Sequence, residues 1–185
     1  MKYKCLINER FQFGQFSFGP IEKSHLYDIM DWRNKQLNIL RTKKIHTKED
    51  QDRYFDNVII PSMDMDEPTS ILFSFFKENV LIGYGGLTNI DWSVKKAEIS
   101  FLLNNELAKE TTEYLEIFTM FLKMLKNIAF KEVKLHRLFT ETYDLRPIHV
   151  QALEREMNLE GRLKDHIFQD GKYVDVLFHG ILNEV

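Results

Sequence analysis

The sequence predicts a mixed α/β fold, and two patterns carry this prediction. Strand-like and helix-like segments follow one another in the order β-α-α-β-β-β-α-β-α-β-β. Short turns, Glu78-Asn79 and Asp170-Gly171, join neighbouring strand-like runs in the middle and at the end of the chain. This order predicts a mixed sheet with helices on both faces. A length of 185 residues without linker or repeat predicts that residues 1–185 form one domain.

The N-terminal elements are predicted from the spacing of apolar residues. Residues 12–18 alternate Phe with small or polar residues, which indicates one strand. Residues 22–34 have helical spacing, with Ser24 as a candidate cap. A second helix is expected over residues 47–60, because Thr47 precedes Lys-Glu-Asp as a capping residue would.

The remaining elements are clearer because their patterns are longer. Strands are expected at 70–76, 80–88, 97–103, 137–143, 159–169 and 172–182, and helices at 113–130 and 147–157. Glycines at 83, 85 and 86 lie inside a strand pattern and indicate close backbone packing or a bulge. Counting outward from the last turn places His166 opposite Asp175.

Composition excludes several classes of function. The net charge is −3 and no basic run occurs, which argues against a nucleic-acid partner. The six histidines lack close ligand spacing and there is one cysteine, so no metal site is expected. The N-terminus lacks the apolar run of a signal peptide and no stretch approaches membrane-spanning length. We therefore expect a reduced, cytoplasmic protein without a membrane partner.

Three stretches resemble the GNAT N-acetyltransferase superfamily. Leu81–Asp91 with Ala97–Leu103 resembles two central strands of the branch that includes ribosomal-protein N-terminal acetyltransferases. Ala129–Tyr143 resembles the end of the cofactor-side helix and the next strand, and Gly161–Leu182 resembles the terminal hairpin. The triplet Trp32-Arg33-Asn34 resembles one found in acetyltransferases that act on nucleotide-linked amino sugars. The resemblance implies a GNAT-like mixed sheet with a C-terminal hairpin.

The resemblance also implies acetyl-CoA as co-substrate. In this family two strands diverge and the pantetheine arm pairs with exposed strand backbone, which would be offered here by Phe101, Leu102 and Leu103. Phosphate contacts would come from Lys109, Thr111 and Thr112, all in the loop before the long helix. Arg146 is either a further phosphate ligand or a solvated side chain.

The phosphate-binding loop departs from the family pattern. Residues 104–113 contain no glycine, although the family uses glycines there to direct backbone N–H groups at the pyrophosphate. Glu106, Glu110 and Glu113 place negative charge in the same segment. We therefore expect weak CoA binding, and tighter binding when Glu110 and Glu113 become Gln. Leu153 also stands where many members carry a tyrosine that protonates the leaving thiolate.

Amide formation from an amine and a thioester requires a group that removes the ammonium proton. Glu98, in the predicted strand 97–103, is a candidate base, with a structural carboxylate as the alternative. His149 is a second candidate, with a packed core histidine as the alternative. Asp144 is expected to cap the helix that begins at Pro147.

Two functions stay open from the sequence. The first is an acetyl-CoA-dependent N-acetyltransferase acting on a primary amine, with a nucleotide-linked amino sugar favoured because of Trp32, Arg33 and Asn34. The second is a non-catalytic or repurposed GNAT-fold protein that binds CoA weakly or not at all. The resemblance leaves a homodimer open.

Overall fold

A computed structural model describes residues 2–184, and these divide into two compact units. Unit 1 runs up to Ile90 and includes Ser100–Ala108, whereas unit 2 comprises Asp91–Ile99 and the chain from Lys109 onward. Strand β5 (Lys96–Leu103) contributes residues to both units. That residues 1–185 act as one domain stays a prediction.

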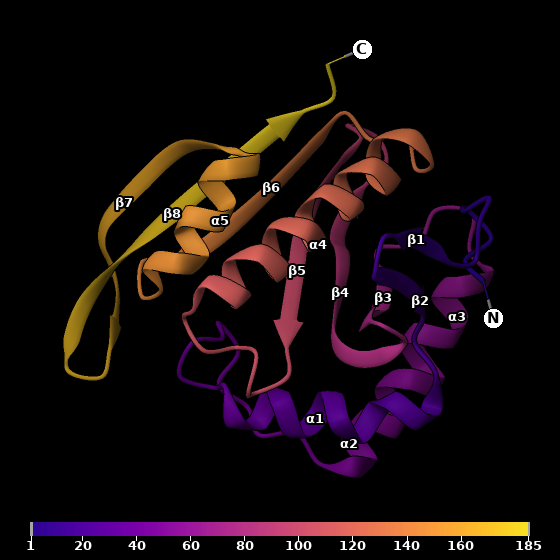
Figure 1. Ribbon diagram of the computed structural model, residues 1–185, viewed down its shortest axis with the longest axis horizontal. Coiled ribbons are helices and arrows are strands. Elements are labelled where there is room, and N and C mark those ends of the chain that lie inside the picture. Colours follow the sequence, from indigo (N-terminus) through magenta and orange to yellow (C-terminus); the bar gives the residue numbers. More distant parts are fainter. Residues whose placement is uncertain (1, 185) are drawn as a thin grey trace. The chain divides into compact units, whose positions relative to one another are not determined.

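Unit 1 contains an antiparallel sheet built on phenylalanines. Its strands β1 (Phe11–Phe13), β2 (Phe16–Pro20), β3 (Ile71–Lys77) and β4 (Val80–Asp91) are hydrogen-bonded neighbours in that order (Figure 1). The prediction of one strand over 12–18 is wrong. A turn interrupts it at Gly14, whose φ of 57° folds β1 back on β2. Phe16 and Phe18 of β2 are buried and Phe18 stacks on Phe73 at 5.3 Å, whereas Phe13 of β1 is 58% exposed.

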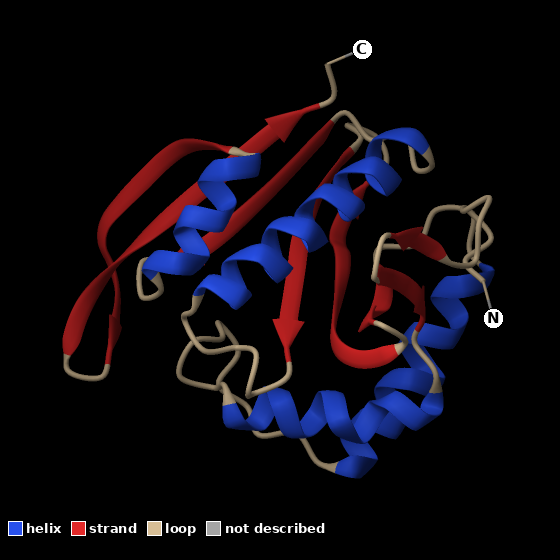
Figure 2. Cartoon of the chain, viewed as in Figure 1, coloured by secondary structure: helices blue, strands red, loops and turns tan. Residues whose placement is uncertain are grey.

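The helices of unit 1 come from two segments (Figure 2). The first comprises the short 3-10 turn η1 (Lys23–His25) and α1 (Leu26–Lys35). The cap predicted at Ser24 is wrong. Glu22 caps this segment together with His25, whose Nδ1 accepts a hydrogen bond from the Glu22 N–H at 3.2 Å. The second segment comprises α2 (Lys48–Tyr54), a π-helical turn η2 (Phe55–Ile59) and α3 (Ile60–Asp64).

The cap predicted for the second segment is confirmed. The Thr47 hydroxyl accepts from the Asp50 N–H at 3.2 Å, and the Asp50 carboxylate accepts from the Thr47 N–H at 3.2 Å. These reciprocal bonds satisfy donors that a helix start otherwise leaves without partners. The π-helical turn directly precedes Pro61 in α3, a residue that has no N–H for the regular helical ladder.

The glycines of β4 allow close backbone packing, as predicted. A Cβ added at Gly83 would lie 2.5 Å from the Leu102 carbonyl oxygen, and one at Gly86 would lie 2.1 Å from that of Ile71. Both distances are far below van der Waals contact, so neither position accepts a side chain without backbone movement. The predicted turn at Glu78-Asn79 is also confirmed, because φ is 52° and 65° at these residues.

Unit 2 combines strands and two helices. β5 pairs with β6 (Arg137–Tyr143), which is followed by β8 (Lys172–Leu182) and then β7 (Asn158–Gln169). The β5–β6 pair is parallel and its ladder runs from Lys96–Arg137 to Glu98–Phe139. The other strand pairs of this unit are antiparallel. The predicted mixed α/β fold, with a mixed sheet and a C-terminal hairpin, is confirmed.

The long helix α4 (Thr112–Lys131) and the shorter α5 (Pro147–Glu156) pack against each other in unit 2. Lys126 on α4 and Glu156 at the end of α5 form an ion pair at 2.5 Å. Half of α4 is buried, which agrees with its nearly continuous apolar sequence. Among residues 2–184, no helix is both long and apolar enough to cross a bilayer.

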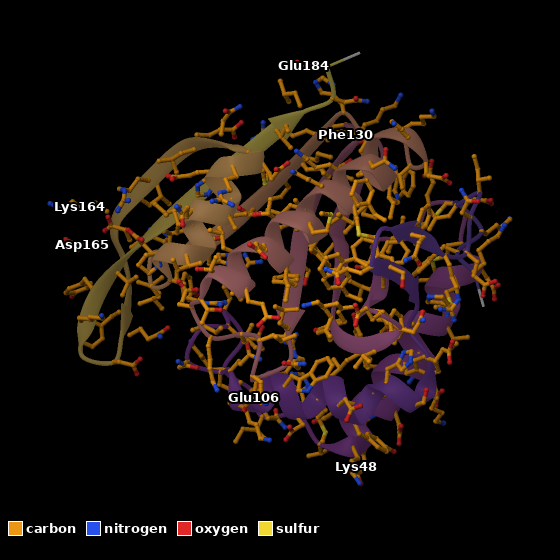
Figure 3. All side chains as sticks on the ribbon, viewed as in Figure 1. Lys48, Glu106, Phe130, Lys164, Asp165 and Glu184 are labelled. Atoms are coloured by element: carbon orange, nitrogen blue, oxygen red, sulfur yellow. The ribbon has the colours of Figure 1, made fainter. Side chains whose placement is uncertain are left out.

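The terminal hairpin departs from the predicted register. The turn at Asp170-Gly171 pairs Gln169 with Lys172, as expected. The ladder then passes from Ile167–Val174 to Leu163–Val176, so three residues of β7 oppose Asp175 alone. The prediction that His166 lies opposite Asp175 is therefore wrong. Asp165 adopts φ 50° at this bulge, and Figure 3 shows Lys164 and Asp165 at the bend of β7.

Candidate active site

A cavity of about 520 Å³ lies within unit 1, between α1, the segment α2–η2 and β4. Its wall combines aliphatic and aromatic side chains with charged ones, most of which are cations. The lining residues include Arg33, Lys44, His46, Asp50, Arg53, Tyr54 and Tyr84. A pocket with an apolar wall and a few polar groups is the usual form of a small-molecule site.

The triplet Trp32-Arg33-Asn34 contributes to this cavity in different ways. Arg33 lines it and donates a hydrogen bond from Nη1 to the Tyr84 hydroxyl at 2.6 Å. Asn34 does not line it but holds the backbone of His46: its Nδ2 donates to the carbonyl at 2.8 Å and its Oδ1 accepts from the N–H at 2.9 Å. Trp32 is mostly buried and is not part of the wall. The substrate-binding role predicted for all three stays a prediction.

Nε2 of the His46 imidazole is a buried polar atom. It has no hydrogen-bond partner in the protein. Burial, and then the positive charges of Arg33 and Lys44, lower the pKa of this imidazole. His46 is therefore uncharged at neutral pH. A buried polar atom without a protein partner indicates a place where a ligand or a water molecule binds.

The end of α1 also fixes the end of β5. Gln36, the residue that ends α1, donates from Nε2 to the Leu103 carbonyl at 2.8 Å and to Asn105 Oδ1 at 3.0 Å. The Asn104 N–H donates to the Ile82 carbonyl at 2.8 Å, which holds β5 beside β4. The cavity residue Tyr84 thus lies on the strand next to Phe101, Leu102 and Leu103, the segment predicted to hold the pantetheine arm.

The acidic loop before α4 is anchored in unit 2. The Glu110 carboxylate forms an ion pair with Arg146 at 3.0 Å and accepts from the Ile148 N–H at 2.6 Å. Glu110 therefore caps the start of α5. The cap predicted at Asp144 is wrong, because the Asp144 side chain pairs with Arg162 at 2.7 Å. Arg146 also lies over the Tyr114 ring, 4.5 Å from its centroid.

The other loop residues with predicted cofactor roles divide into two kinds. Thr111 caps α4, since its hydroxyl accepts from the Tyr114 N–H at 3.2 Å. Thr112 is the first residue of α4 and is exposed, as is Lys109. Their contact with a phosphate stays a prediction. Arg146 is not a solvated side chain, because Glu110 and Tyr114 hold it.

The two candidate bases lie in different environments of unit 2. Glu98 is buried, with 4% of its surface exposed, and forms the last pair of the β5–β6 ladder with Phe139. His149 stacks on Phe118 at 4.4 Å, and its Nδ1 lies 2.7 Å from the Tyr114 hydroxyl. Burial lowers the pKa of His149 well below its usual value. The catalytic role of either residue stays a prediction.

Two further observations limit the chemistry. Leu153 is fully buried, so it belongs to the core of unit 2. Within the described residues, no group of three or more His, Cys, Asp or Glu side chains could hold a metal ion. The residues fit acetyl-CoA where it was expected: the β5–β6 ladder ends at Glu98 while β5 continues to Leu103, and Arg146 neutralises the charge of Glu110.

Comparison with known proteins identifies the family. The model of the acetyltransferase (GNAT) domain matches residues 20–178, which is most of the chain. The chain therefore belongs to this family and is an N-acetyltransferase.

Solved structures agree with the fold. A spermidine N-acetyltransferase chimera from Vibrio cholerae and hSSAT has a TM-score of 0.74 at 20% identity, covering 91% of this chain and 96% of that one. The spermidine N-acetyltransferase from Vibrio cholerae in complex with CoA and spermine has a TM-score of 0.74 at 18% identity, covering 92% and 96%. At these identities the likeness establishes the fold alone.

Most residues of the cavity wall could not be predicted from the sequence. Lys44, His46, Arg53, Tyr54 and Tyr84 carry no motif, and they come from a loop, a helix and a strand. One signal was available: Asn34, singled out in the triplet, is the residue that positions His46.

Proposed function

We propose that this chain is an acetyl-CoA-dependent N-acetyltransferase whose primary-amine acceptor enters the cavity of unit 1. The observation that carries the proposal is the position of that cavity beside β5: its wall residue Tyr84 lies on β4, the hydrogen-bonded neighbour of β5. Family membership supports the reaction class. The polyamine named for the Vibrio cholerae protein and a nucleotide-linked amino sugar are the two acceptor classes to compare.

In the proposed reaction, the chain supplies binding, proton removal and exclusion of water. When bound, acetyl-CoA supplies a thioester carbonyl as acetyl donor. The backbone of Phe101, Leu102 and Leu103 would hold the pantetheine arm, and Lys109, Thr112 and Arg146 would contact its phosphates. The family tyrosine is replaced by Leu153, so the departing thiolate takes its proton from solvent or another donor.

Glu98 is the proposed base. An amine in its ammonium form cannot attack the thioester, so Glu98 would accept one proton from it, directly or through water. The amine nitrogen then forms the new C–N bond while the C–S bond breaks, and the nitrogen releases its second proton to solvent or to the departing thiolate. Glu98 is buried on β5, the strand whose backbone would hold the pantetheine arm.

The test combines binding and turnover. Calorimetry should detect binding of acetyl-CoA, and release of the free thiol should follow acetyl transfer to amines. Glu98→Gln should lower kcat by ~10²-fold or more and leave acetyl-CoA affinity nearly unchanged. Glu116→Gln, at an exposed position of α4, is the control for loss of one carboxylate.

Three outcomes would revise the proposal. A wild-type chain that does not bind acetyl-CoA would support the repurposed GNAT protein instead. Loss of turnover in His149→Ala but not in Glu98→Gln would move the base to His149. Normal turnover in both variants would assign proton removal to solvent.

A further inference from the structure

The cavity of unit 1 is rich in positive charge. Arg33 on α1, Lys44 in the loop before α2 and Arg53 on α2 all line it. Asp50 is the one carboxylate among the residues of the wall. The chain as a whole has a net charge of −3, so this local excess of cations is not a reflection of composition.

The single carboxylate already has partners. Asp50 forms an ion pair with Lys44 at 3.1 Å and accepts the Thr47 N–H at 3.2 Å. These interactions lower the pKa of Asp50, with the hydrogen bond from Thr47 as the larger cause and Lys44 next. Asp50 therefore stays ionised, and its carboxylate is hydrogen-bonded at the start of α2. Arg33 donates to the Tyr84 hydroxyl instead of a carboxylate, and the charge of Arg53 is a smaller cause of the lowered Asp50 pKa.

From this lining we infer that the acceptor is an amine that also carries an oxyanion, a phosphate or a carboxylate, and that Arg33, Lys44 and Arg53 bind that oxyanion. The inference rests on the proposed function, because it assumes that the acceptor enters this cavity. Guanidinium groups present several N–H donors in one plane and match the oxygens of phosphate and carboxylate groups. A polyamine would bring further positive charge to three cations and be repelled.

Neighbouring groups suit the same ligand. The Tyr84 hydroxyl accepts a hydrogen bond from Arg33 at 2.6 Å, which restrains the guanidinium against the wall. Nε2 of His46 is buried without a protein partner, and burial together with Arg33 and Lys44 lowers the pKa of the ring. An uncharged imidazole can donate to or accept from a polar ligand without adding charge. Tyr54 and the aliphatic residues of the wall would contact the uncharged body of the ligand.

The experiment compares matched amines that differ in the oxyanion. Glucosamine and glucosamine 6-phosphate form the phosphate pair, 1,4-diaminobutane and 4-aminobutyrate form the carboxylate pair, and spermidine represents the polyamines. We measure kcat/KM for acetylation of each with acetyl-CoA. The expected result is a preference of ~10-fold or more for the anionic member of at least one pair, with spermidine poorer than either.

Lys44 and Lys35 provide a matched pair of variants. Both lysines form one ion pair with an aspartate, and their side chains are 62% and 61% exposed. Only Lys44 lines the cavity. Lys44→Glu should reduce kcat/KM for the preferred anionic amine by ~10-fold or more, chiefly through KM. Lys35→Glu introduces the same change in charge outside the cavity and should leave it within about twofold.

Each result decides the inference. Preference for spermidine or for the members that lack an oxyanion would overturn it, as would equal effects of Lys44→Glu and Lys35→Glu. If acetyl-CoA binds but none of the five amines is acetylated, the inference fails while the cofactor part of the proposed function stands. If acetyl-CoA does not bind at all, the proposed function itself fails.

Discussion

The hydroxyl oxygen of Tyr114 lies 2.7 Å from Nδ1 of His149. Tyr114 is buried, and burial raises its pKa, so its phenol stays protonated. His149 stacks on Phe118 with an angle of 10° between the rings. The ring nitrogen that faces Tyr114 is thus already hydrogen-bonded, and we expect His149 to act as a packing residue between α4 and α5.

We therefore expect His149→Ala to act on stability. The substitution removes the ring stack and the hydrogen bond between His149 and the Tyr114 hydroxyl, which should cost ~2–3 kcal/mol of the free energy of unfolding. Urea denaturation measures this cost. Turnover per folded molecule should stay within a few-fold of wild type.

Tyr114→Phe is the companion variant, since it removes the hydroxyl and keeps the ring. It should cost about 1 kcal/mol, and the double variant should cost less than the two single ones together, because both disrupt one hydrogen bond. A ~10²-fold loss of kcat in His149→Ala at unchanged stability would contradict this view and make His149 the base.

The second prediction concerns the acidic loop, in which we expect Glu113 and Glu110 to have different roles. Glu113→Gln removes a charge from the exposed first turn of α4 and should tighten acetyl-CoA binding by about fivefold, equivalent to ~1 kcal/mol of repulsion at a solvated site. Glu110→Gln breaks the ion pair with Arg146 and weakens the cap of α5. It should lower stability by about 1 kcal/mol.

Both single variants should be tested by calorimetric titration with acetyl-CoA and by thermal unfolding. These measurements show whether Glu113 affects binding and Glu110 affects stability. Similar tightening by both substitutions would mean that the carboxylate of Glu110 faces the phosphates in spite of its partner. Unchanged affinity in Glu113→Gln would mean that this side chain is too far from the phosphates to matter.

Local patterns were sufficient to predict most elements of the fold. The strand at Arg137–Tyr143 has the predicted bounds, and the cap at Thr47 needs only residues three positions apart. The strand predicted over 12–18 failed at Gly14, where the chain turns with a φ of 57°. Phe13 and Phe16 are three positions apart, so the alternation of phenylalanines is broken at this turn, and Phe13 is 58% exposed whereas Phe16 is buried.

The site could be predicted far less well, because its contacts join distant residues. Glu110 and Arg146 are 36 positions apart, and Arg33 and Tyr84 are 51 apart. Neither pair follows from helix or strand spacing. The family resemblance supplied expected roles for Arg33 and Arg146, but not the neutralisation of Glu110 or the cationic lining of the cavity.

A third prediction concerns acid sensitivity. His179 is fully buried opposite Thr140 in the β6–β8 ladder, and neither ring nitrogen has a partner in the protein. Burial lowers its pKa, so the unfolded chain binds a proton more readily than the folded one. Stability is then complete above the unfolded value of about 6.5 and falls as the pH drops toward the folded pKa.

His179→Leu should flatten this dependence. The free energy of unfolding of this variant should change less between pH 7.5 and pH 5.5 than that of wild type. These two pH values each lie about one unit from the unfolded pKa. At pH 7.5 the variant should be as stable as wild type or more so, because two unpartnered buried nitrogens are removed. His136→Gln, at an exposed position of the same unit, is the control. Equal pH dependence in His179→Leu and wild type would refute the role of His179.

The fourth prediction concerns the bulge of the terminal hairpin. Asp175 accepts the Asp165 N–H at 2.8 Å and an Arg162 hydrogen bond at 2.7 Å, and these contacts lower its pKa, the first of them most. Asp175→Ala removes both contacts and should lower the free energy of unfolding. The specificity constant for the amine acceptor should not change, because the hairpin bulge acts as scaffold.

Asp175→Ala, combined with a substitution of His166, also tests the register of the hairpin. In the structure His166 belongs to the bulge instead of pairing across the ladder, so His166→Gln should change stability by less than about 0.5 kcal/mol. The double variant with Asp175→Ala should show additive costs, since residues without a shared contact rarely couple. Asp144→Asn is the control for Arg162, because it removes that residue's other carboxylate without touching Asp165. A coupling energy above about 0.5 kcal/mol between His166 and Asp175 would restore the simple register, in which the two side chains face each other.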